Sequence, residues 1–168
     1  MLRGRSTKRG GAKVDPPSVP NIREVHLVRS TDISEPGQKT ITPYFTVEDA
    51  DRLMRFLIAA FDAAIVKKSR YDDGRVQHAR LLIGNSLIML NESTDAYPAN
   101  ISQMHIDVAD ADVVFQTALR HGATPVMDPN IRPRGARMAG TKDPCGNIWW
   151  LSSRAANAVP DAKSPESH

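Results

Sequence analysis

The strongest constraint on this chain is a short sequence that recurs after 61 residues. Val47-Glu48-Asp49-Ala50-Asp51 returns as Val108-Ala109-Asp110-Ala111-Asp112. Alternating residues precede each copy and an amphipathic segment follows it, so Asp49 and Asp110 are each placed to cap a helix. An internal repeat of this kind predicts a fold built from two copies of one supersecondary unit.

Each copy has the pattern of a βαβββ unit. The apolar residues expected to share a helix face are Leu53, Phe56, Leu57 and Ala60 in the first copy, and Ala111, Phe115, Ala118 and Leu119 in the second, which closes at Gly122. We expect strands at 41–47, 64–70, 76–83, 87–91, 101–108, 124–128, 136–142 and 148–152. The predicted fold class is α+β, with two βαβββ modules (41–92 and 101–152) forming a curved, half-barrel mixed sheet and helices on its convex side.

The flanks have a different composition from the repeat-containing body at 41–152. Residues 1–40 are predicted to be a flexible basic N-terminal tail and lead-in, with one short accessory strand at 25–28, and residues 153–168 a flexible C-terminal tail. The first 13 residues hold five basic side chains and no acid. Such a tail can touch nucleic acid or another partner, but it has no aromatic residue to stack on bases, so a solvated terminus is favoured and no nucleic-acid partner is expected.

Composition excludes several classes of protein. The chain has 168 residues, which suits one domain, and a single cysteine, Cys145, which excludes an internal disulfide framework and a cysteine zinc cluster. It has no apolar run of membrane-spanning length, and the basic N-terminus lacks the apolar stretch of a signal peptide. We therefore expect a cytoplasmic protein without a membrane partner.

Strand alternation predicts which side chains face away from the helices. Successive residues of a strand point to opposite faces, and the apolar ones are expected to pack under the helices. The other face would then be a polar groove with an aromatic edge. The side chains predicted to line it are Tyr44, His78, Arg80, Gln103, His105, Asp107 and Trp150, with Trp149 in the core.

Five segments resemble the vicinal oxygen chelate superfamily, which includes glyoxalase I, bleomycin-resistance and fosfomycin-resistance proteins, and extradiol dioxygenases. They are 42–50, 76–84, 108–112, 121–123 and 143–150, of which the last, Asp-Pro-Cys-Gly-Asn-Ile-Trp-Trp, is the most specific. It points to a glyoxalase-like branch resembling the phosphonate-operon protein. The resemblance implies a homodimer whose grooves are built from two chains, and it gives Arg137 a counterpart in a recurrent arginine of the branch.

The resemblance also implies four metal-ligand positions, which fall here on Thr42, Met89, Gln103 and Trp150. Only Gln103 is a good oxygen ligand, whereas an open catalytic site normally has about three protein ligands. No cofactor is therefore favoured. The alternative is a divalent metal (iron, zinc, nickel or manganese) held by His78, His105 and Asp107.

Two functions follow from these predictions. The first is a protein that binds a small planar or amphipathic ligand, with or without an anionic group, through Tyr44, His78, Arg80, Gln103, Arg137 and Trp150. The second is an enzyme: a metal-dependent lyase, isomerase or dioxygenase using His78, His105 and Asp107, or a metal-free one in which Asp107 orients His105 as general base. In the plainer interpretation, Arg80 and Arg137 form ion pairs with Asp107, Glu92 or Asp95.

Overall fold

The computed structural model describes residues 39–133 and 135–154. Its elements, in chain order, are β1 (Tyr44–Val47), α1 (Ala50–Phe61), β2 (Ala64–Arg70), β3 (Val76–Ile83), β4 (Ser86–Glu92), β5 (Gln103–Asp107), α2 (Ala111–Arg120), β6 (Thr124–Ile131), β7 (Ala136–Lys142) and β8 (Ile148–Arg154). The two predicted βαβββ modules are therefore confirmed. We call β1–β4 with α1 module 1, and β5–β8 with α2 module 2.

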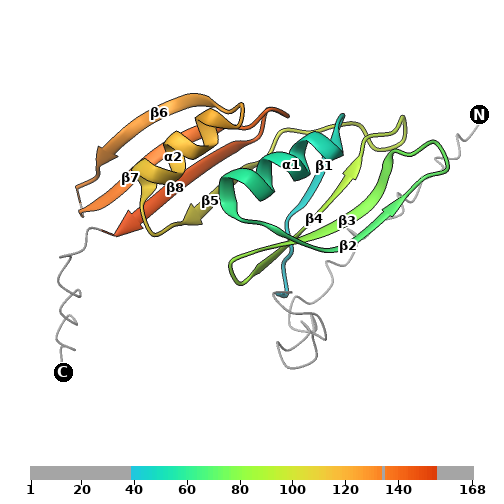
Figure 1. The fold of residues 1–168 in the computed structure, drawn as a ribbon, viewed down its shortest axis with the longest axis horizontal. Coiled ribbons are helices and arrows are strands. Elements are labelled where there is room, and N and C mark those ends of the chain that lie inside the picture. The colour runs from blue at the N-terminus through green and yellow to red at the C-terminus, as the bar shows by residue number, and fades with distance from the viewer. Residues whose placement is uncertain (1–38, 134, 155–168) are drawn as a thin grey trace, which may run out of the picture.

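Each module forms its own four-stranded mixed sheet, and neither sheet is closed. The strand orders are β1-β4-β3-β2 and β5-β8-β7-β6. In both sheets the first and last strands of the module run parallel, and the other neighbours run antiparallel. Figure 1 shows α1 and α2 side by side, each with the sheet of its own module. The expected curved sheet is thus divided into two separate hydrogen-bonded sheets, with β1 and β5 each at one edge.

Both helices begin where the repeat predicts. The Asp49 side chain accepts a hydrogen bond from the backbone N–H of Arg52 at 2.8 Å, and Asp110 accepts from Asp112 and Val113 at 2.9 and 3.1 Å. These carboxylates satisfy backbone donors that the first turn of a helix leaves unpaired. The same two aspartates that mark the repeat therefore set the start of α1 and α2.

The modules are joined through their helix-side faces. Trp149 of β8 is 2% exposed and packs between two rings of module 1. Its ring centroid lies 5.7 Å from that of Phe45 and 4.8 Å from that of Phe61. Aromatic burial of this kind contributes the largest share of apolar area in a small core. Trp149 therefore fixes how module 2 sits against module 1.

The motif 143–150 folds into a buried polar turn. The Asp143 carboxylate, 4% exposed, accepts hydrogen bonds from the backbone N–H groups of Cys145 and Asn147 at 2.8 and 3.0 Å. It also accepts from Asn147 Nδ2 at 3.0 Å and from Trp149 Nε1 at 2.9 Å. Asn147 Oδ1 in turn accepts from the backbone N–H of Ser102, the residue before β5, at 3.0 Å. The most specific sequence element is thus a structural connection between β7, β8 and β5.

Several strand boundaries differ from the sequence prediction. Strand β1 begins at Tyr44 and not at 41, and β6 continues three residues past 128. Strand β8 continues two residues past 152, because the buried Ser153 hydroxyl accepts the backbone N–H of Ala111 at 3.1 Å and ties the strand to the start of α2. The predicted flexible C-terminal tail is therefore wrong for 153–154, which belong to β8. The accessory strand at 25–28 and the rest of the predicted tails, 1–38 and 155–168, lie outside the described residues. Within those residues, no helix is both long and apolar enough to cross a membrane.

Candidate functional site

Each sheet has one face covered by its helix and one face turned away from it. In module 1, Phe45, Ala79 and Leu90 are buried on the helix side. Their neighbours along the strands point the other way, and we call that side the open face of module 1. The cross-strand partners Tyr44, Met89 and Arg80 lie on it, as does His78.

Tyr44 and His78 form a pair on this open face. Tyr44 Oη lies 3.1 Å from His78 Nδ1, and the two ring centroids are 5.7 Å apart. Burial lowers the pKa of His78, and the charges of Arg80 and Lys67 lower it further. Burial also raises the pKa of Tyr44. The pair therefore favours a neutral imidazole beside a protonated phenol at neutral pH. These two hydrogen-bonding groups lie near the positive charges of Arg80 and Lys67.

The open face of module 2 carries an indole held in place. Trp150 Nε1 donates a hydrogen bond to Gln103 Oε1 at 3.0 Å, and the two residues come from neighbouring strands. The Trp150 ring lies across Gly140 of β7, so close that a Cβ atom at Gly140 would be 2.7 Å from Trp150 Cζ3. Glycine inside a strand often marks such a close approach. Gly140 is therefore a site residue that the sequence analysis missed.

His105 and Asp107 share the face of Trp150. His105 is the cross-strand partner of Trp150, and Asp107 is the partner of Ser152. Both side chains are exposed. No hydrogen bond joins His105 to Asp107 in the part of the chain that the structure describes, so Asp107 does not orient the imidazole in this conformation.

Among residues 39–133 and 135–154, the predicted site residues of each module bond to one another and not to those of the other module. The hydrogen bonds and ring contacts of Tyr44 and His78 stay within module 1, and those of Gln103 and Trp150 stay within module 2. The predicted groove residues are thus brought together as two separate sets, Tyr44, His78 and Arg80 in one, and Gln103, His105, Asp107 and Trp150 in the other.

The metal-ligand positions implied by the resemblance do not form a ligand set. Met89 supplies only a thioether on module 1, and the Gln103 oxygen already accepts the indole N–H of Trp150, which itself has no lone pair to offer. Among residues 39–133 and 135–154, no cluster of three or more His, Cys, Asp or Glu side chains could hold a metal ion. The alternative set of His78, His105 and Asp107 is divided between the modules.

Arg137 lies on the other side of its sheet, which corrects its expected place in the groove. Its Nε and Nη2 atoms donate to Asp112 Oδ2 and Oδ1 of α2, both at 2.7 Å. This fork raises the pKa of Arg137 and lowers that of Asp112. Its register partner is Ser153, which bonds to the start of α2. Arg137 therefore holds α2 on the sheet, through an acid that the sequence analysis did not consider as its partner.

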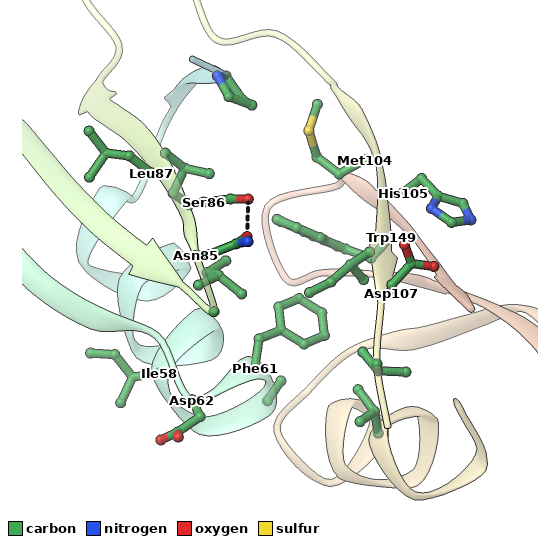
Figure 2. Close-up of a pocket in the computed structure, with 18 of the residues that line it drawn as sticks. Ile58, Phe61, Asp62, Asn85, Ser86, Leu87, Met104, His105, Asp107 and Trp149 are labelled. Carbon is green, nitrogen blue, oxygen red and sulfur yellow. Dashed lines mark hydrogen bonds between the residues drawn. The ribbon is translucent and has the colours of Figure 1, made fainter. Parts of the chain in front are cut away.

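Between the modules runs a groove with a volume of about 730 Å³. It is bounded by the end of α1, the β3–β4 hairpin and β5 (Figure 2). Figure 2 shows His105 and Asp107 on the side of β5 away from Phe61, whereas the Trp149 ring lies within the groove. The groove is thus a mostly apolar seam between the modules. Of the predicted site residues, only His105 and Asp107 are among those that line it.

Cys145 fills a turn, as the plainer interpretation of the sequence predicts. Its thiol lies 3.5 Å from the backbone oxygen of Asp49. Burial, followed by the nearby acids Asp143 and Asp49, raises its pKa to about 11. Since the thiolate is the nucleophilic form, a thiol that stays protonated at neutral pH suits a packing role and not a nucleophilic one.

Comparisons with known proteins agree with this architecture. A model of the Glyoxalase/Bleomycin resistance protein/Dioxygenase superfamily matches residues 39–151. An uncharacterized protein of Mycobacterium bovis is 30% identical over 125 residues, covering 68% of this chain and 82% of the relative. An uncharacterized protein of Mycobacterium tuberculosis is 29% identical over 145 residues, covering 80% and 85%. The chain belongs to the glyoxalase/bleomycin resistance/dioxygenase superfamily.

Solved structures share the fold. TioX from Micromonospora sp. ML1 superposes with a TM-score of 0.60 at 21% identity, covering 68% of this chain and 98% of TioX. The PhnB protein from Bacillus cereus gives 0.58 at 23% identity, covering 68% and 99%. The fosfomycin resistance protein FosX from Mesorhizobium loti gives 0.51 at 22% identity, covering 69% and 92%. At these identities the likeness concerns the fold alone, and the function has to be argued from the site.

Proposed function

We propose that this protein binds a small planar or amphipathic ligand carrying an anionic group, as a homodimer. The open face of module 1 in one protomer lies opposite the open face of module 2 in the other. The single observation that carries the proposal is the Trp150 indole, tethered by Gln103 at 3.0 Å and laid across Gly140. A flat ring fixed before binding offers a stacking surface at little cost in side-chain entropy.

The chemistry of module 1 complements that of module 2. The former presents the Arg80 guanidinium and the Tyr44–His78 pair, and the latter presents the indole and an amide. Guanidinium groups recognise carboxylate and phosphate oxygens by paired hydrogen bonds, whereas an indole recognises a flat ring. A ligand with both parts would use both faces.

The dimer follows from the division of the site. In each protomer, one set of site residues lies on the open face of module 1 and the other set lies on the open face of module 2. Two copies related by a twofold axis would pair the unlike faces and complete two identical grooves. Isologous dimers of this kind are the commonest oligomers. Superfamily relatives that build grooves from two chains give the same arrangement a precedent.

The test compares Trp150→Ala with Tyr97→Ala in a thermal-shift screen of planar carboxylates, phosphates and neutral analogues. Tyr97 is 70% exposed and lies outside both open faces, so it controls for the loss of an aromatic ring. We expect some compounds to stabilise the unchanged protein and Tyr97→Ala but not Trp150→Ala. Equal stabilisation of all three would refute the site. Native mass spectrometry of the same samples should report two subunits, and a monomer would refute the composite groove.

Catalysis is the second candidate, favoured by the exposed His105 and Asp107 beside Trp150. In a dimer the same groove would also bring His78 of one protomer towards this pair. Metal analysis of protein purified without chelator tests the metal-dependent form, for which stoichiometric iron, zinc, nickel or manganese is expected. His105→Ala tests both forms, since a turnover that survives the change with dimerisation intact would exclude His105 from the chemistry.

A further inference from the structure

An irregularity in the pairing of β2 with β3 determines which lysine shares a face with Arg80. Ile65 is the cross-strand partner of Leu81, but the next pair is Lys67 with Arg80, so Val66 is left without a partner in the ladder. This is a β-bulge, in which one strand contributes an extra residue and its following side chains change face. Bulges often re-aim side chains beside functional sites.

The bulge turns Lys67 to the open face of module 1. Leu81 is fully buried on the helix side, and Ile65 shares that side with it. Simple alternation from Ile65 would place Lys67 on the helix side as well. Because Val66 is bulged, Lys67 instead lies opposite Arg80, whose other neighbour is Met89 on the open face, while Lys68 lies opposite the buried Ala79.

We propose that Lys67 and Arg80 together bind the oxyanion of the ligand, a carboxylate or a phosphate, on the open face of module 1. This deepens the proposed function and rests on it for the location of the groove. Arg80 supplies the directional fork, and Lys67 supplies a compact charge at the outer strand of the sheet. The specificity of the site for anions then depends on Lys67, which lies on the open face because of the bulge at Val66.

Two observations support a shared anion site. Both cations lower the pKa of the same imidazole, that of His78, after burial, so their charges are directed to one region of the face. The strand positions of this face also carry no carboxylate: they are Tyr44, Thr46, Ala64, Lys67, Ser69, His78, Arg80, Leu82, Leu87, Met89 and Asn91. The region is therefore cationic. The hydroxyls of Thr46 and Ser69 already donate within the protein, to Asn91 Oδ1 and to the backbone oxygen of His78, so the recognition of an oxyanion depends on the two cations.

Neighbouring lysines provide a matched test. Lys67→Ala and Lys68→Ala remove the same charge from adjacent positions of one exposed strand, on opposite faces of the sheet. The full chain would be titrated with inorganic phosphate and separately with acetate at constant ionic strength, with amide chemical shifts of β2 and β3 as the readout. We expect Lys67→Ala to weaken phosphate binding by about fivefold or more, Lys68→Ala to leave it unchanged, and Lys67→Arg to restore it. The acetate arm shows whether a carboxylate suffices.

Each other outcome overturns the proposal. Equal weakening by the two alanine variants would show general attraction to a basic surface, and no shift changes near Lys67 would show that no oxyanion binds there. The response of Trp150 to planar ligands distinguishes failure of the Lys67 assignment from failure of the proposed function. If planar ligands perturb Trp150 but the two alanine variants bind them equally, only the Lys67 assignment fails. If no compound perturbs Trp150, the proposed function fails whatever phosphate does.

Discussion

The Asp143 carboxylate accepts the indole N–H of Trp149 at 2.9 Å, so the turn between β7 and β8 is bonded to the ring that joins the two modules. Four donors converge on this single buried side chain. The acid therefore acts on the packing of module 2 against module 1 and not on a ligand.

Replacing Asp143 by alanine should lower the free energy of unfolding by about 3 kcal/mol, because the buried donors would lose their acceptor. Urea unfolding of the variant measures this. Asp95→Ala, at an exposed acid, is the control and should change little. A loss no larger than that of the control would show that the Asp143 network contributes nothing to stability.

Gly140→Ala should displace the Trp150 ring, because the added Cβ would lie 2.7 Å from Trp150 Cζ3. We expect ligand-induced stabilisation to fall as it does in Trp150→Ala. The double variant should be no worse than Trp150→Ala alone, since both changes remove the same stacking surface. Additive losses would mean that Gly140 acts independently of the indole.

Arg137 and Arg80 should have different roles, the first in stability and the second in ligand binding. Arg137→Ala should leave ligand binding intact and lower thermal stability slightly, because its fork to Asp112 is partly exposed to solvent. Arg80→Ala should abolish the preference for anionic ligands. Isothermal titration with one planar carboxylate compares them, and a loss of affinity in Arg137→Ala would return Arg137 to the site.

The pH dependence of stability should carry a contribution from His78. Its pKa is lowered in the folded state, by burial first and by Arg80 and Lys67 next, so the unfolded state binds the proton more tightly. The free energy of unfolding should therefore be highest above about pH 6.5 and fall as the pH drops below that value. His78→Gln should reduce this dependence. An NMR titration should show the imidazole pKa rising in Lys67→Ala but not in Lys68→Ala.

Much of the fold was predictable from local chemistry. The capping acids Asp49 and Asp110 lie beside amphipathic segments, and alternation correctly separated Trp149 from Trp150. These signals are short-range, since they depend on helix caps and on the two faces of a strand. They also predicted which residues of β5 would avoid the core.

The rest depended on packing between elements distant in the sequence. Nothing local indicated that Trp149 would pack between Phe45 and Phe61, an arrangement that joins the modules by their helix sides. The place of Arg137 came from resemblance, whereas its face follows from its pairing with Ser153. The bulge at Val66 changes the face of Lys67 without any glycine or proline to mark it.

The duplicated unit has produced halves with unlike chemistry, one rich in cations and hydroxyls and the other presenting an indole and an amide. Each half has its own helix and its own ladder, so substitutions in one can alter its recognition chemistry while the other keeps its shape. A substitution on the cationic sheet can therefore change the charge preference while the stacking surface on the other sheet stays as it is.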